Sequence, residues 1–188
     1  MSTPQDVFDR VIVPIIDREG GYVDHPADRG GPTNWGITEA TARRHGYRGD
    51  MKDLPREVAL HIYAVEYWDG PNFDGVAKLS VPIAAELADT GINMGVFVAA
   101  GFLQRALNLF NSRGRLYEDL RADGRIGPKT LKALETYLKR RGADAEAVML
   151  AALNSFQGER YAAIAENDVS QEDFAYGWFR TRVLEGAP

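Results

Sequence analysis

Apolar residues recur every three or four positions along most of the chain, and this spacing is typical of amphipathic helices. The first such segment, residues 3–19, is followed by two glycines that end it. Residues 22–37 lack the helical period and are rich in turn-forming residues, so a long loop or a small hairpin region is predicted, with one short strand at 33–38. The rest is predicted to be helical, with helices over residues 38–46, 53–68, 80–95, 96–110, 128–142, 144–165 and 172–184.

The 188 residues suffice for about one domain, or for two small pieces that share one core. The chain has no internal repeat, low-complexity tract or Pro/Ser-rich linker. A boundary near residues 78–82 separates two predicted segments, 1–80 and 81–188. Because the helices on both sides are apolar, we expect the segments to pack into one compact domain.

Composition excludes several kinds of chemistry. The absence of cysteine rules out disulfides, thiolate metal sites and a cysteine nucleophile. The three histidines form no His-Glu-x-x-His pair, so a zinc peptidase or amidase is not expected. The longest apolar run, residues 95–103, is short for a membrane span, and residues 1–10 lack the features of a signal peptide. We therefore expect synthesis in the cytosol and no membrane insertion.

The net charge of −5 is mildly acidic, whereas nucleic-acid binders usually carry a basic stripe. One stretch, residues 113–141, is locally basic, with nine Lys or Arg against four Asp or Glu. Two interpretations stay open for this stretch. It is either a solvated helix face or a surface for an anionic polymer. A nucleic acid is not an expected partner.

Glu19 stands at the end of the first predicted helix, beside the two glycines. The negative end of the helix dipole and apolar surroundings both raise the pKa of a carboxyl group. A general acid needs such a raised pKa, because it must still carry its proton near neutral pH. Asp28 and Thr33 follow in the polar loop. An acid on a helix end with a second carboxylate in a loop is the plan of glycoside hydrolysis. Taken singly, each residue also fits a structural role: a helix stop, an Asx turn and a strand position.

Longer motifs add a family resemblance. The stretch EGGYVDHPADRGGPTNWGIT, residues 19–38, resembles the opening of the glycoside hydrolase 108 family. Members of that family are peptidoglycan N-acetylmuramidases, found as phage endolysins and as secretion-associated muramidases of bacteria. DTGINMG at 89–95, LQRALN at 103–108 and DGRIGPKT at 123–130 resemble the peptidoglycan-binding segment that follows in that family. The likeness covers roughly residues 5–165.

The resemblance implies a mainly all-α, lysozyme-like helical fold with a small β-region after the first helix. It places the catalytic glutamate at Glu19. The spacing is also similar to that of T-even phage lysozymes, although Thr33 lies one residue closer than in those enzymes. The implied reaction is hydrolysis of the β-1,4 bond between N-acetylmuramic acid and N-acetylglucosamine. Glu19 would be the acid, and Asp28 would stabilise the transition state or activate a water held by Thr33, with inversion favoured and no metal or other cofactor.

Three further residues are candidates for substrate binding. Tyr22 and Trp35 are expected to stack on sugar rings, and Asn93 to hydrogen-bond an acetamido group; packing roles are the alternatives. Tyr47 is weighed in the same way, with packing favoured. The expected partners are peptidoglycan glycan strands and a holin pore that releases a monomeric enzyme to the wall. The competing interpretations are a lytic transglycosylase and a wall-binding or secretion accessory protein without turnover.

Overall fold

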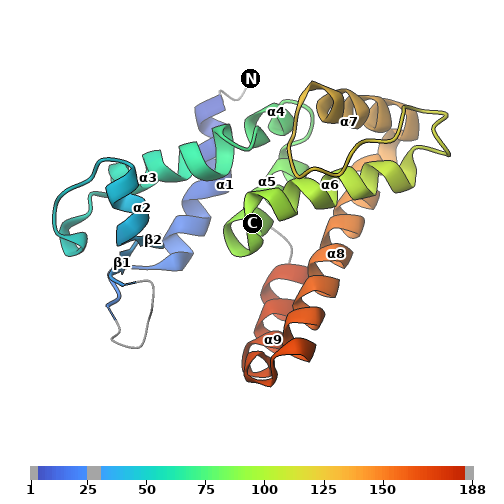
Figure 1. Cartoon of the computed structure of the whole chain (residues 1–188). Helices are drawn as coiled ribbons and strands as arrows, with labels where there is room; N and C mark the ends of the chain where they lie inside the picture. The colour runs from blue at the N-terminus through green and yellow to red at the C-terminus, as the bar shows by residue number, and fades with distance from the viewer. Residues whose placement is uncertain (1–3, 25–30, 185–188) are drawn as a thin grey trace. The chain divides into compact units, whose positions relative to one another are not determined.

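The computed structural model describes residues 4–24 and 31–184, with the side chains of residues 4–6, 18 and 19 outside that description. The chain forms two compact units, residues 1–70 and 71–188. Most described residues are helical, and the two strands form one small antiparallel sheet after the first helix (Figure 1). The predicted fold class, mainly α-helical with a small β-region, is confirmed.

The first unit is built around helix α1, which runs from Pro4 to Glu19. One face of α1 is buried and packs on helix α3, while Phe8 meets Trp68 edge-on with ring centroids 6.2 Å apart. These apolar contacts hold the first unit's core. The other elements are β1 (Thr33–Asn34), β2 (Ile37–Thr38), α2 (Glu39–Arg44), the 3-10 turn η1 (Met51–Asp53), α3 (Arg56–Ala64) and the π-helical turn η2 (Val65–Asp69).

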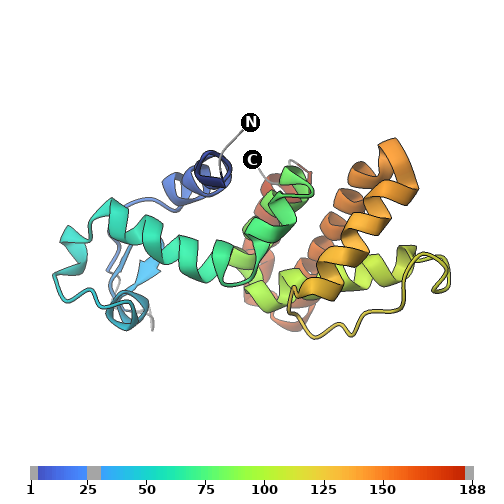
Figure 2. The ribbon, with the colours of Figure 1, turned by 90° about the horizontal axis from the view of Figure 1, so that it is seen from above.

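The second unit is a group of helices in which α5 and α6 pack closely and α8 contacts both. Helix α7 lies against α6 and α8, and α9 turns back onto α8 (Figure 2). A loop without regular structure, residues 111–127, joins α6 to α7. The elements are α4 (Phe73–Ala77), α5 (Val81–Met94), α6 (Val96–Phe110), α7 (Pro128–Arg141), η3 (Gly142–Asp144), α8 (Ala145–Asn167), η4 (Val169–Gln171), α9 (Glu172–Trp178) and η5 (Phe179–Leu184).

The structure differs from the sequence-based expectation in two elements. The segment 33–38 is not one strand but two two-residue strands that form a hairpin. Helix α4 does not follow from the sequence pattern, because five residues are too few to show a helical period. Its N-cap, Asn72, adopts a left-handed backbone with φ of 64° and donates from Nδ2 to the Ile126 carbonyl at 2.8 Å. A tertiary contact of this kind cannot be recognised from the local pattern.

Candidate functional site

The two predicted catalytic carboxylates lie at the edge of what the structure describes. Glu19 is the last residue of α1, and Gly20 follows with φ of +83°, the left-handed backbone that ends a helix. The helix end predicted from the glycine pair is therefore present. The Glu19 side chain and the whole of Asp28 lie outside the described residues. Their roles stay predictions.

Thr33, the third predicted catalytic residue, begins strand β1 and is half-buried. Its backbone pairs with Val23, and the two N–H···O bonds are both 2.8 Å long. This bridge brings the segment just after α1 alongside β1. The Thr33 hydroxyl donates to the Gly31 carbonyl at 3.3 Å. The chain thus brings two of the predicted site residues, Thr33 and Tyr22, into neighbouring segments.

Tyr22 has polar neighbours at its hydroxyl and at its ring. Its hydroxyl donates to Asp24 Oδ2 at 3.1 Å, and the Lys52 ammonium lies 5.6 Å from the ring centroid. Desolvation and then the hydrogen bond to Asp24 raise the pKa of Tyr22. A cation near an aromatic face is attracted by the electrons of the ring, so Lys52 helps to fix the tyrosine. The sequence pattern gives no indication of Lys52 at this position.

Trp35 and Gly36 form the turn of the hairpin, with φ of 53° and 72°. Positive φ at both central residues is the type I′ geometry that suits two-residue hairpins. The tryptophan is held in this rare conformation by two bonds. Its Nε1 donates to the Leu54 carbonyl at 3.1 Å, and its own carbonyl accepts from the Tyr63 hydroxyl at 3.2 Å. The indole N–H is therefore occupied by the protein, while the half-buried ring keeps some exposure.

Asn34 is a positioning residue that sequence reasoning missed. It is 4% exposed, and its Nδ2 donates to the carbonyls of Met51 and Lys52 at 2.7 and 3.2 Å. Buried amides that bridge two backbone groups fix the distance between segments. Asn34 therefore ties the hairpin to the 3-10 turn η1. An asparagine in a loop is typical of a turn, so the sequence carries no signal of this role.

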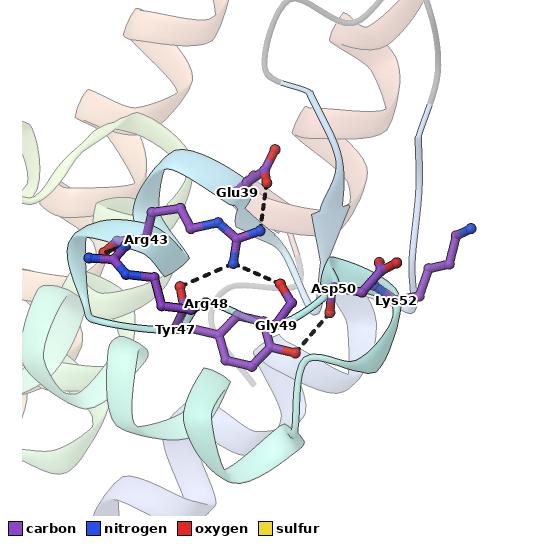
Figure 3. Close-up of polar contacts among 7 residues, drawn as sticks. All are labelled: Glu39, Arg43, Tyr47, Arg48, Gly49, Asp50 and Lys52. Carbon is purple, nitrogen blue, oxygen red and sulfur yellow. Dashed lines mark hydrogen bonds and ion pairs between the residues drawn. The ribbon is translucent and has the colours of Figure 1, made fainter.

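The loop that leads into η1 is itself fixed by Arg43 on α2 (Figure 3). Arg43 Nη1 donates to the carbonyls of Tyr47 and Gly49 at 3.1 and 2.7 Å, and Nη2 pairs with Glu39 at 2.7 Å. The Tyr47 hydroxyl donates to the Asp50 carbonyl at 2.8 Å. The Tyr47 hydroxyl thus helps to hold the loop, and the packing role favoured for this residue stays a prediction. Arg43 thus joins the first residue of α2, directly after the hairpin, to the loop that leads into η1.

The predicted binding residue Asn93 lies in the second unit, on helix α5. Its side chain is exposed, and Nδ2 donates to the Asp89 carbonyl one turn earlier at 2.8 Å. The preceding residues of the same motif point inward. Asp89 and Thr90 are 1% and 2% exposed, and Asp89 forms a short ion pair with Arg182 of η5. The motif therefore begins with buried residues, Asp89 and Thr90, and has an exposed residue, Asn93, near its end.

The motif at residues 123–130 closes a polar loop around a buried amide on α6. Gln104 is 2% exposed and donates from Nε2 to Asp123 Oδ1 and the Arg125 carbonyl at 3.0 and 2.9 Å. Its Oε1 accepts from the Gly124 backbone N–H at 2.9 Å. Gly124 has φ of +73°, and a Cβ there would lie 2.7 Å from the Phe97 carbonyl oxygen. Glycine is required at this position by both the backbone and the space.

The described part of the chain gives two further findings. None of its helices has the length and apolar character needed to cross a membrane. Within the same residues, no three His, Cys, Asp or Glu side chains gather closely enough to hold a metal ion.

Comparison with known proteins covers most of the chain. Residues 12–95 match the glycosyl hydrolase 108 family, and residues 98–183 match a predicted peptidoglycan domain. The solved structure of Brucella abortus SagA is similar over 97% of this chain and 92% of its own, with 28% identity and a TM-score of 0.68. No curated protein matches the chain. The lysozyme-like helical fold that the resemblance implied is confirmed. Residues 12–95 are therefore those of a glycosyl hydrolase 108 domain and residues 98–183 those of a peptidoglycan domain, and together they support a cell-wall hydrolase or peptidoglycan-binding role.

Proposed function

We propose that the chain hydrolyses the β-1,4 bond between N-acetylmuramic acid and N-acetylglucosamine in peptidoglycan, the reaction of a lysozyme. The observation that carries the proposal is the family match over residues 12–95, which contains the motif that begins at Glu19. Glu19 ends helix α1 beside a left-handed glycine. A glutamate at such a helix end, next to a backbone without side chains, suits a proton donor to a large polymeric substrate.

In this mechanism Glu19 protonates the leaving glycosidic oxygen. Asp28 stabilises the oxocarbenium-like transition state or takes the proton of an attacking water, and Thr33 holds that water. In general, carboxyl groups about 6.5–9.5 Å apart give inversion and those about 5–5.5 Å apart give retention. The spacing of the motif favours inversion by analogy with the T-even phage lysozymes. Tyr22, Trp35 and Asn93 are proposed to contact the sugars through the exposed parts of their side chains.

The hairpin geometry supports this arrangement. The backbone bridge between Val23 and Thr33 holds the segment after α1 against β1, so residues on both sides of the 25–30 segment are close. Asn34 and Trp35 then fasten β1 to the η1 segment. A water-positioning hydroxyl needs such a fixed frame, because a displacement of about 1 Å costs a large part of the rate.

The test is digestion of purified sacculi by the wild type and by Glu19→Gln, followed by mass spectrometry of the soluble fragments. Glu57→Gln is the matched control, since it makes the same chemical change on an exposed position of α3. We expect reducing muramic-acid ends from the wild type and from Glu57→Gln, and none from Glu19→Gln. If the fragments instead had anhydro ends, the chain would be a lytic transglycosylase and this proposal would be wrong.

A second candidate is a peptidoglycan-binding protein without turnover, favoured by the peptidoglycan domain at residues 98–183. That protein would sediment with sacculi, release no fragments and tolerate Glu19→Gln. The same experiment therefore separates the two functions. A phage endolysin role, release through a holin pore and a monomeric state stay predictions from the sequence.

A further inference from the structure

The second unit contains a cavity of about 610 Å³ beside the loop that joins α6 to α7. Its walls come from the loop, from the first residues of α7 and from Gln104 of α6. This volume is in the range of sites for small molecules or for a few residues of a polymer. The cavity has two kinds of lining. Some lining residues are apolar or aromatic, namely Tyr117, Leu120, Pro128 and Ala133, and others carry charged side chains.

The charged part of the lining holds four cations, three of which have no ion-pair partner among the residues that the structure describes. Arg121, Arg125, Lys129 and Lys132 all line the cavity. Lys132 pairs with Glu135 at 2.9 Å. Arg121, Arg125 and Lys129 form no ion pair with any carboxylate of residues 4–24 and 31–184. Three cations are thus available to a ligand.

Two carboxylates of the lining accept hydrogen bonds from uncharged groups and keep their negative charge, and Arg121 lies near enough to Asp123 to contribute to its lowered pKa. Asp119 accepts a short hydrogen bond from Asn111. Asp123 accepts from Gln104 and from the Arg125 backbone N–H, and these bonds lower its pKa. Glu118 is the remaining carboxylate of the lining. The lining thus carries cations and carboxylates in nearly equal number, and the cations without an ion pair are the groups that can receive an anionic ligand.

The wall of the cavity is held in place before any ligand binds. Asn108 of α6 donates to the Leu120 carbonyl and accepts from the Leu120 N–H, both at 2.8 Å. The Tyr117 hydroxyl donates to the Leu107 carbonyl at 2.8 Å. Together with Gln104, these bonds fasten the irregular loop to one helix at three points. A preorganised site loses less entropy when its ligand binds.

We propose that this cavity binds the carboxylate-bearing stem peptide of peptidoglycan. The wall offers a neutral glycan and a peptide that carries both carboxylates and alanine methyl groups. Cations beside a small apolar surface match the peptide, because guanidinium groups bind carboxylates in a forked geometry. Neutral sugars are bound chiefly by stacking on aromatic rings, and Tyr117 is the one aromatic side chain in the described lining. The proposal concerns binding by the peptidoglycan domain and does not depend on the cleavage step.

The test compares two double variants, both made on the Glu19→Gln chain, which the proposed function expects to be inactive, so that binding is measured without turnover. Arg121→Glu with Lys129→Glu reverses two cations of the cavity. Arg113→Glu with Arg115→Glu reverses two exposed cations of the same basic stretch outside the lining, with an equal change in net charge. The probe is a purified disaccharide-tetrapeptide muropeptide. The same disaccharide without its peptide, with the lactyl carboxyl group blocked as an amide so that the sugar is neutral, is the ligand control, and binding is measured by calorimetry.

We expect the cavity variant to bind the muropeptide at least about tenfold more weakly than the unmodified cavity, the loss of one charge-assisted bond or more. The Arg113/Arg115 variant should stay within about twofold, and the peptide-free disaccharide should bind weakly to every variant. Circular dichroism and the melting temperature show whether each variant folds. If the charge reversals unfold the loop, the milder pair Arg121→Ala and Lys129→Ala gives the same comparison.

Three results would overturn the proposal. Equal weakening by the Arg113/Arg115 variant would mean diffuse charge attraction. Equal binding of the disaccharide with and without peptide would assign the cavity to the glycan. Preferential binding of a phosphodiester wall polymer, tested with purified teichoic acid, would assign it to phosphate. Cleavage is measured separately, on chains that keep Glu19, so failure of the cavity proposal leaves the hydrolase proposal untouched.

Discussion

Asn34 makes the sharpest stability prediction for the first unit. Replacing it by alanine removes the amide that joins strand β1 to the 3-10 turn η1, through bonds of 2.7 and 3.2 Å to two carbonyls. A net hydrogen bond is worth about 0.5–1.5 kcal/mol, so the two together contribute about 1–3 kcal/mol. The Met51 carbonyl belongs to a residue that is 2% exposed, and an acceptor left without its partner there adds a desolvation cost. We therefore expect Asn34→Ala to lower the free energy of unfolding by about 2–4 kcal/mol.

The assay is urea unfolding of the wild type and the variant at neutral pH. Asn167→Ala is the matched control, because its amide makes one bond of 2.6 Å to the Ala163 carbonyl on the exposed surface of α8. That control should change stability by less than about 0.5 kcal/mol. Digestion of sacculi by Asn34→Ala should fall as well, since Thr33 and Trp35 share the hairpin. Equal, small changes for both variants would refute the claim that the buried amide fixes the hairpin.

Two other predictions concern the second unit. Arg182→Leu should lower the free energy of unfolding in urea by about 3–5 kcal/mol, because Arg182 pairs with the carboxylate of Asp89, a residue that is 1% exposed. The control Arg44→Ala removes a surface ion pair with Glu66 and should lower that free energy by less than about 1 kcal/mol. Burial raises the pKa of Tyr117 and of Tyr161 to about 12 from the ordinary 10.0. These side chains lose their protons first in the unfolded chain, so stability should fall as the pH rises from about 10 to about 12. A tyrosinate absorbance titration of the native protein should show both groups ionising late, and their ionisation together with the other tyrosines would contradict their burial.

The helices of the fold follow largely from the sequence. The pattern predicts a helix over residues 96–110, and α6 has the same bounds, because its apolar period and the preceding glycine both mark the boundaries. Helix α5 is predicted over 80–95 from its Ser80 cap, and the Ser80 hydroxyl does accept from the Ile83 N–H. Short elements escape this reasoning. The five residues of α4 are too few for a period, and only the contact of Asn72 with a distant carbonyl explains its start.

The candidate site is predictable only in part. The end of α1 at Glu19 follows from the two glycines, and the loop after it follows from its turn formers. The hairpin turn at Trp35 does not follow, because tryptophan is not a residue that favours positive φ. It is held there by Leu54 and Tyr63, which are distant in sequence. Asn93 and Asp89 share one motif, yet one is exposed and the other buried, and the letters alone do not distinguish them.

In each unit, one buried side-chain amide holds a segment that has little regular structure. The hairpin region and the 111–127 loop are polar and have little regular structure, so backbone pairing and apolar packing fix only part of their geometry. In each, a nearly buried amide provides the missing order: Asn34 binds two carbonyls of η1, and Gln104 binds both N–H and C=O groups of the 123–130 motif. Because the helical cores of the two units are built from other residues, loss of either amide should disturb its loop more than its helices. The chain thus places its two proposed functional surfaces on loops whose geometry depends on single side chains. Replacing one of these side chains should therefore reduce function at a stability where the helices are still folded.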